Sequence, residues 1–411
     1  MELKINYEYT YFIYPFAINE KNYKKYVINL IKNPKFTLRL YDNFKDIDLF
    51  NYFMPSIRKN IFQDFTFSKE KIEAYRKISP SNKYKLLEEQ NSLIFDYNLE
   101  NEIQGKIEEK DGIFFKITKI ELVCFKSGIC FLLFKTNLEE TEKYSDLLNF
   151  NHKFTNINLE NKNLKKLEKI RVQTNTFENI EEITQTIESI SGKKISSAEL
   201  DIDENMFLTY SYVCIDSKDW NKEIDFENIK NEFLKLSTIS PSNTNINVDY
   251  DKLNMITNSS YMKIRINNKG SFLICSSTDV NNYTKIPNIY EREYLFTYLI
   301  AIHQRYYLKQ LSKEYNNKSN IKKTAEKFIA FTKNIWINEV TTEGLGQKIY
   351  KRCKEKLNLE ELYQEVKSKY DTFYKEEKID KNIKQNKYII ILLVLSIIFG
   401  MANLCGWLFL K

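Results

Sequence analysis

The chain has 411 residues, of which 43% are hydrophobic, so it is long enough to bury a large core. Its 62 Lys and Arg are interleaved with 55 Asp and Glu, and a formal charge of only +7 argues against direct nucleic-acid binding. The two histidines, His152 and His303, leave little scope for His-based catalysis. The sequence also contains no phosphate-binding loop and no CxxC pair among its six cysteines, so we do not expect an enzyme.

Residues 1–155 are predicted to form a cytoplasmic α/β lobe. Hydrophobic residues alternate with polar ones over residues 3–15, which is typical of a half-buried strand. A helical pattern follows, and then two strand-like runs, 113–125 and 129–134, meet at Lys-Ser-Gly, a short hairpin connection.

Residues 170–288 are predicted to form a second cytoplasmic α/β lobe, joined to the first by a polar linker at 156–169. A strand, a helix, the pentapeptide Ile-Ser-Pro-Ser-Asn and a hairpin occur in this order in both lobes, with the pentapeptide at 78–82 and 239–243. Duplication of one lobe would explain the repetition. Chance recurrence of ordinary turn residues would explain it too, so both interpretations stay open.

Residues 289–387 are predicted to form an antiparallel helical stalk. Apolar residues recur at helical spacing along three successive segments, and the last runs from Leu359 without Gly or Pro toward the C-terminal end. On the first segment His303, Gln304 and Arg305 are adjacent, and Arg305 can pair with Glu339 between helices. We interpret these four residues as a helical-stalk interface.

Residues 388–410 are predicted to be a single transmembrane helix, because 23 consecutive positions carry no charge. Lys381, Lys384 and Lys387 precede it, which favours a cytoplasmic N-terminal part and a position beside lipid headgroups. Trp407 lies near the far interface, where an indole is favoured. The predicted fold is therefore an α+β membrane protein, in which a cytoplasmic α/β domain and a helical stalk lead into one C-terminal membrane helix.

This layout resembles the CorA-like family of divalent-cation transporters. The local resemblance lies at 298–306 (YLIAIHQRY), 331–341 (FTKNIWINEVT) and 359–366 (LEELYQEV), and it extends over residues 290–403. The family's Gly-Met-Asn signature is similar to Gly400-Met401-Ala402-Asn403, which carries an inserted Ala. The family has a second membrane helix, whereas we expect a single-pass protein here, because only residues 404–411 follow.

Gly400, Met401 and Asn403 therefore have two interpretations. An amide exposed to lipid is costly, so Asn403 is expected to face either a pore or a neighbouring helix. In the second case the small residues around it permit close helix packing.

The resemblance implies a pentameric homo-oligomer in the bacterial inner membrane, closed by cytosolic Mg²⁺ between subunits. Asp201, Asp203 and Glu204 offer the oxygen ligands that Mg²⁺ prefers, although we favour the interpretation that they form an acidic surface loop. Some CorA-like proteins accompany type III CRISPR defence systems, in which a small nucleotide second messenger is thought to activate the membrane protein.

Three functions follow from these observations. The first is an oligomeric membrane protein whose cytoplasmic domain senses a ligand and controls ion permeation or membrane integrity. The second is a tail-anchored receptor or scaffold without a pore, and the third is a Mg²⁺ transporter.

Overall fold

The computed structural model describes residues 2–42, 44–62, 69–107, 112–139, 141–155, 170–173, 180–193, 207–246, 255–316 and 321–409. The predicted linker at 156–169 lies outside these residues. The chain divides into two compact units. Unit 1 comprises residues 1–309 and 337–359, and unit 2 comprises residues 310–336 and 360–411.

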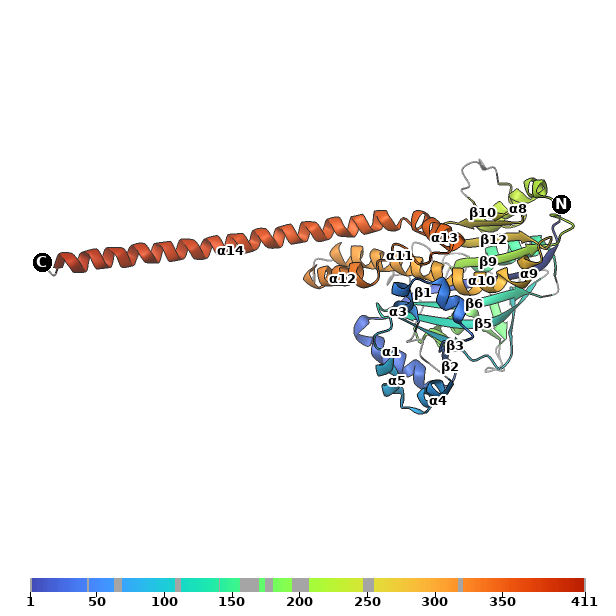
Figure 1. Ribbon diagram of the computed structural model, residues 1–411, viewed down its shortest axis with the longest axis horizontal. Coiled ribbons are helices and arrows are strands. Elements are labelled where there is room, and N and C mark those ends of the chain that lie inside the picture. The colour runs from blue at the N-terminus through green and yellow to red at the C-terminus, as the bar shows by residue number, and fades with distance from the viewer. Residues whose placement is uncertain are drawn as a thin grey trace. The chain divides into compact units, whose positions relative to one another are not determined.

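Unit 1 is built on one mixed sheet, in which the path β10-β11-β12-β9-β1-β6-β5-β4-β7-β8 is extended by β2 and β3 beside β5 (Figure 1). Both predicted lobes therefore contribute strands to the same sheet. The strands are β1 (Ile5–Ala17), β2 (Phe36–Leu38), β3 (Ser92–Tyr97), β4 (Ile103–Ile107), β5 (Ile113–Phe125), β6 (Ile129–Leu138), β7 (Ile170–Gln173), β8 (Ile180–Glu182), β9 (Leu208–Ile215), β10 (Ile256–Ser259), β11 (Met262–Ile266) and β12 (Gly270–Ser276).

The central strand β1 carries aromatic residues on both faces, because alternate side chains of a strand point in opposite directions. On one face, Phe12 stacks on Phe154 of α6 with ring centroids 4.0 Å apart. On the other, Tyr9 stacks on Tyr212 of β9 at 5.4 Å, and its hydroxyl donates to the carbonyl of Pro287. Helices therefore cover both faces of the sheet, which explains why β1 is almost completely buried.

Helices of unit 1 accompany this sheet. They are α1 (Glu20–Lys32), α2 (Ile47–Tyr52), α3 (Pro55–Ile61), α4 (Lys69–Lys77), α5 (Pro80–Leu86), α6 (Tyr144–Thr155), α7 (Ile183–Ser191), η1 (Glu223–Asp225), α8 (Phe226–Thr238), α9 (Asn281–Thr284), α10 (Ile286–Ile289), η3 (Tyr290–Tyr294), α11 (Leu295–Asn316) and α13 (Gly344–Lys356). The last residues of α11 belong to unit 2.

The sheet gives no support to duplication of one lobe. In the first half the opening strand β1 runs antiparallel to the second hairpin strand β6, whereas in the second half β9 runs parallel to β12. The pentapeptides also differ in role. Ser79 and Pro80 begin α5, while Ile239 ends α8 in the left-handed region and the rest of its pentapeptide follows that helix.

The predicted hairpin at Lys126-Ser127-Gly128 is confirmed as the connection between β5 and β6. Gly128 has a φ of 90°, which side-chain-bearing residues rarely adopt. A Cβ atom built at this position would lie 2.1 Å from the carbonyl oxygen of Ile18. Glycine is therefore required here both by the backbone conformation and by the close approach of the chain.

Unit 2 contains the end of α11, then α12 (Ile321–Asn334) and most of α14 (Leu359–Phe409). Phe328 of α12 contacts Tyr363 and Tyr370 of α14, and Trp336, just after α12, stacks on Tyr363 at 4.5 Å. Later residues of α12 therefore meet earlier residues of α14. This arrangement makes the two helices antiparallel, as the sequence predicts for the stalk.

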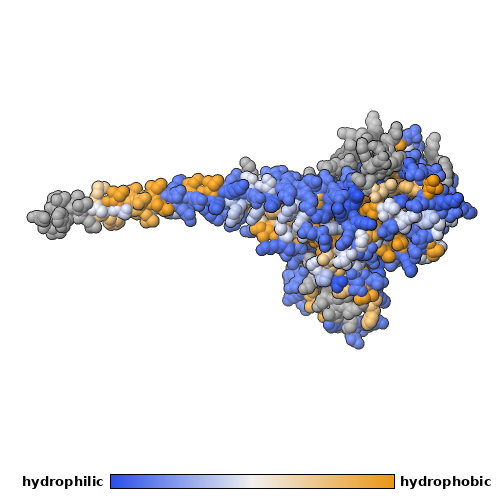
Figure 2. Space-filling view, turned by 45° about the horizontal axis from the view of Figure 1, so that its top comes forward, coloured by the Kyte–Doolittle hydropathy of each residue, from blue (hydrophilic) through white to orange (hydrophobic). Residues whose placement is uncertain are grey.

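Helix α14 is continuous over 51 residues, which corresponds to about 76 Å. It is the one helix of the described residues that is long and apolar enough to cross a membrane. Its side chains from Tyr388 to Met401 are exposed. Figure 2 shows this hydrophobic stretch following a hydrophilic stretch of the same helix. The helix is compatible with a single-pass membrane anchor.

Candidate functional site

A five-residue π-helix, η3, places two oppositely charged side chains next to each other at the entrance to α11. Glu291 is mostly buried and forms ion pairs with Lys135 of β6 at 2.6 Å and Lys119 of β5 at 3.4 Å. The neighbouring Arg292 pairs instead with Asp46, which precedes α2. Such π-type turns are frequent at functional sites, because the extra residue changes the direction in which side chains leave the helix.

Ion pairs and a hydrogen bond keep Glu291 charged inside the fold. Burial on its own would raise the pKa of this carboxyl, but Lys135 and Lys119 outweigh that effect and lower the pKa below its ordinary value. The hydroxyl of Tyr11 also donates to Glu291 at 2.7 Å. The charged form is therefore the native one at neutral pH.

Arg39, which follows β2, connects this cluster to strand β3. Its Nε donates to Oδ2 of Asp96 at 3.1 Å, and its guanidinium also binds Glu121 of β5. Although burial opposes ionisation, Arg39 and Lys119 lower the pKa of Glu121 to about 2. Asp96, Arg39, Glu121, Lys119, Glu291 and Lys135 thus alternate in charge across one face of the sheet.

A cavity of about 430 Å³ opens beside these charges. Its apolar walls come from α2, β5, β6 and α11, and its polar walls from Arg39, Lys119, Glu121 and η3. Tyr41 also belongs to this lining, and its buried hydroxyl has no hydrogen-bond partner among the described residues. Since the charges compensate one another, the cavity suits an uncharged or zwitterionic group that offers a hydrogen bond to Tyr41.

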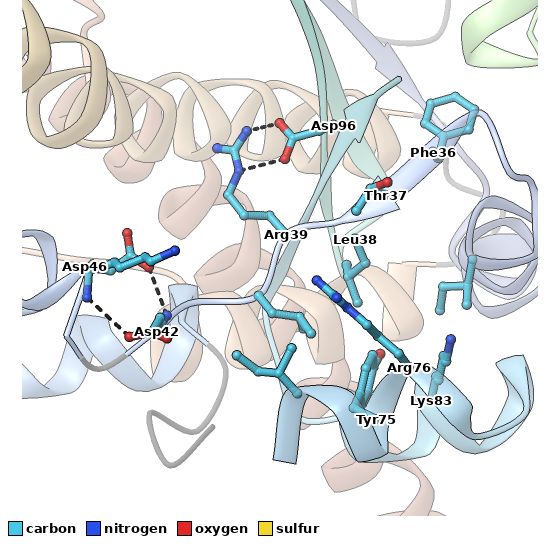
Figure 3. Close-up of a pocket in the computed structure, with 14 residues that line it drawn as sticks. Phe36, Thr37, Leu38, Arg39, Asp42, Asp46, Tyr75, Arg76, Lys83 and Asp96 are labelled. Carbon is cyan, nitrogen blue, oxygen red and sulfur yellow. Dashed lines mark hydrogen bonds and ion pairs between the residues drawn. The ribbon is translucent and has the colours of Figure 1, made fainter. Parts of the chain in front are cut away.

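A second cavity, of about 450 Å³, shares Arg39, Asp46 and Asp96 with the first. Figure 3 shows Arg39 reaching up to Asp96, while Arg76 and Lys83 rise from the helices below. Tyr75 of α4 lies beside Arg76, and Leu38 of β2 faces them. The two cavities bring together residues from α1, α2, α4, α5, α10, η3, α11 and the four strands β2, β3, β5 and β6. Such a convergence of separate elements is the arrangement expected of a ligand-binding region.

His303 and Gln304, which we assign to a helical-stalk interface, lie on the part of α11 that belongs to unit 1. His303 is buried against Phe125 and the hairpin residue Ser127. Gln304 donates to the hydroxyl of Tyr350 on α13 at 2.9 Å and accepts from the amide of Ile337. Both side chains tie α11 to other parts of unit 1.

The predicted ion pair between Arg305 and Glu339 is not formed. Arg305 instead directs one guanidinium nitrogen to the carbonyl of Asn268, 3.5 Å away, and Glu339 is exposed. The chain after α12 continues through a turn and several bends over 335–343 and contains no helix there. Glu339 therefore stands on a loop, which explains why a pairing based on two adjacent helices is wrong.

On α14, the side chains of Lys381, Lys384 and Lys387 are exposed, and Lys381 pairs with Glu377 at 3.0 Å. Gly400 and Met401 lie on the exposed apolar part of the helix. The side chains of Asn403 and Trp407 lie outside the described residues.

The predicted acidic cluster of Asp201, Asp203 and Glu204 also lies outside the part of the chain that the structure describes. Within the described part, no group of three or more His, Cys, Asp or Glu side chains is arranged to hold a metal ion. A Mg²⁺ site therefore stays a prediction from the sequence.

Sequence reasoning did not identify Arg39, Tyr41, Glu121 or Glu291. These residues come from elements far apart in the chain, so no local spacing connects them. One feature of the sequence could have indicated the charged cluster. Glu121 is a carboxylate inside the strongly apolar run Ile-Glu-Leu-Val-Cys-Phe at 120–125. A charge in such a run requires a buried partner.

Neither a protein-family model nor a curated protein matches the sequence.

Proposed function

We propose that the protein is a CorA-like oligomeric membrane protein whose cytoplasmic domain binds a small ligand and thereby controls ion permeation or membrane integrity. The observation that carries the proposal is the continuity of α14. This helix begins at Leu359, in unit 1, and continues without a break to its exposed apolar stretch. A rigid helix that starts in the ligand-binding domain can transmit a displacement to a membrane segment.

The composition of α14 supports insertion into the bacterial inner membrane with the large domain in the cytoplasm. Exposed large apolar side chains occupy nearly every position from Tyr388 to Met401, and water is a poor environment for such a surface. The lysines at 381, 384 and 387 precede that stretch, as is typical of the cytoplasmic side. They are also positioned along the helix to reach anionic lipid headgroups.

Ligand binding in unit 1 is supported by the two adjoining cavities and by the π-helix, which lines the first cavity and leads into α11. Glu291 and Arg292 belong to η3, and η3 leads directly into α11. A ligand that altered either ion pair would change the start of α11. We include a nucleotide second messenger among the ligands to be tested.

A pore requires several copies of the chain, because one membrane helix cannot enclose a pathway. Light scattering of the full chain in detergent measures the number of copies directly. A pentamer supports the proposal, and a monomer contradicts it. The second candidate function, a tail-anchored receptor or scaffold, is favoured by the single candidate span in the described residues and would be the conclusion from a monomer.

A further inference from the structure

The second cavity contains positive charges that the fold does not neutralise. We propose that this cavity, between β2 and the helices α4 and α5, binds a small organic anion whose phosphate or carboxylate group lies against Arg76 and Lys83. This inference rests on the proposed function, because both take unit 1 as the ligand-binding domain. It adds the chemical class of one ligand.

Arg76 and Lys83 come from different helices and converge on the same cavity (Figure 3). Among the described residues, neither forms an ion pair. The ammonium of Lys83 instead lies over the ring of Tyr75, 5.6 Å from its centroid. An arginine and a lysine that meet without a carboxylate provide the charge-assisted hydrogen bonds that phosphates and carboxylates accept.

The acidic side chains of the same cavity already have partners. Asp96 binds Arg39, and Asp46 binds both Arg292 and the amide of Asp42. The carboxylate of Asp42 accepts from the amides of Phe44 and Lys45. Asp96 and Asp46 are therefore paired with cations, whereas Asp42 keeps its negative charge. Lys45 lines the cavity together with Arg76 and Lys83, so three cations outnumber this one carboxylate and the cavity attracts an anion.

The rest of the lining indicates that the anion is attached to an apolar body. Ile31, Phe36, Leu38, Leu40 and Ile72 contribute to the walls, and the buried ring of Tyr75 lies under the ammonium of Lys83. A volume of about 450 Å³ exceeds the space that an inorganic ion needs and falls within the range of small-molecule sites. An aromatic or aliphatic group would fill this space and displace water from it.

The proposal is tested by calorimetric titration of the full chain in detergent with phenyl phosphate, inorganic phosphate and phenol. We expect phenyl phosphate to bind more tightly than inorganic phosphate, and phenol not to bind measurably. Arg76→Gln and Lys83→Gln should each weaken phenyl phosphate binding by about tenfold, because each removes one charge-assisted contact. Raising the salt concentration should weaken binding in the wild type.

Two neighbouring lysines provide matched controls. Lys77 on α4 and Lys85 on α5 are exposed and do not line the cavity, so Lys77→Gln and Lys85→Gln should bind like the wild type. Thermal melting of all four variants checks that they fold. The proposal is overturned if the two cavity variants bind phenyl phosphate as tightly as the controls do, or if phenol binds equally well.

The anion could be free or could be a lipid headgroup, and competition distinguishes the two. Phosphatidylcholine vesicles containing phosphatidic acid should displace phenyl phosphate if a lipid supplies the anion, and should leave it bound if the ligand is a free solute. Both displacement and continued binding of phenyl phosphate are consistent with an anion site in this cavity, because each requires that phenyl phosphate binds there first. Binding that leaves vesicle permeability unchanged would support this site and contradict the proposed control of permeation.

Discussion

The imidazole of His303 lies flat on the ring of Phe125, with centroids 3.8 Å apart and planes inclined by 8°. Its Nε2 atom is 2.8 Å from Oγ of Ser127, at the turn between β5 and β6. Burial lowers the pKa of His303 to about 3, so this histidine is neutral at physiological pH. It joins helix α11 to the β5–β6 hairpin of the sheet without carrying charge.

This low pKa predicts a specific dependence of stability on pH. Between the folded pKa of about 3 and the ordinary value of 6.5, the unfolded chain binds a proton at His303 and the folded chain does not. Stability should therefore fall as the pH is lowered through this range, by about 2 kcal/mol at pH 5. His303→Gln should remove this contribution. Denaturant unfolding of both proteins at pH 7 and pH 5 measures it, and parallel losses in the two would contradict the assignment.

The buried pair of Arg39 and Glu121 predicts a second loss of stability at lower pH. Because the pKa of Glu121 is lowered from 4.5 to about 2, its contribution is present above about pH 4.5 and is lost as the pH falls toward 2. Glu121→Gln should cost about 3 kcal/mol at pH 7, since Arg39 and Lys119 lose a buried partner. Urea unfolding tests this expectation. The exposed pair of Glu102 and Lys116 serves as control, and Glu102→Gln should change stability by less than about 1 kcal/mol.

Substitution of two glycines with positive φ measures the cost of an unfavourable backbone conformation separately from the cost of a steric clash. Gly128 and Gly192 have φ values of 90° and 66°, but only at Gly128 would a Cβ atom meet neighbouring backbone. Gly192→Ala should cost about 1 kcal/mol for its backbone conformation alone. Gly128→Ala should cost several times more, because the β5–β6 turn would have to move away from Ile18. Equal losses in thermal or chemical unfolding would show that the contact is unimportant.

The apolar stretch of α14 predicts stable membrane association. Leu393→Arg combined with Ile397→Arg places two charges on one face of this stretch and should release a large fraction of the protein from membranes, at a cost of about 3 kcal/mol for each charge. Extraction at alkaline pH followed by sedimentation measures the released fraction. The matched control is Asn382→Arg with Asn386→Arg, which adds two charges at the same spacing on the hydrophilic stretch, and it should stay in the pellet. Equal release of both variants would contradict a membrane role for residues 388–401.

Local features of the fold were predictable from the sequence. The strand at 3–15, the hairpin at Lys126-Ser127-Gly128 and the long C-terminal helix follow from residue periodicity and turn composition, and all three are present. The joining of both halves into one sheet was not predictable, because the pairing of β1 with β9 connects residues about two hundred positions apart. The parallel pairing of β9 with β12 is also non-local, with partners about sixty positions apart.

The candidate site was even less accessible to sequence reasoning. Arg39 and Glu291 look like ordinary surface residues in the sequence, and they become part of one cluster only because β5 and β6 carry Lys119, Glu121 and Lys135 between them. The π-helix that places Glu291 has no sequence signature that we could use. Among the described residues, Cys124, Cys130, Cys214, Cys275 and Cys353 are buried and free.

Ion flux from vesicles is the most direct test of ligand-controlled permeation. The full chain would be reconstituted into vesicles of phosphatidylcholine and phosphatidylglycerol loaded with a fluorescent dye and K⁺, and release would be followed with and without phenyl phosphate or a panel of nucleotides. We predict release that depends on one of these ligands and on oligomeric protein. Permeability equal to that of protein-free vesicles under every ligand would contradict the proposed function and favour a receptor without a pore.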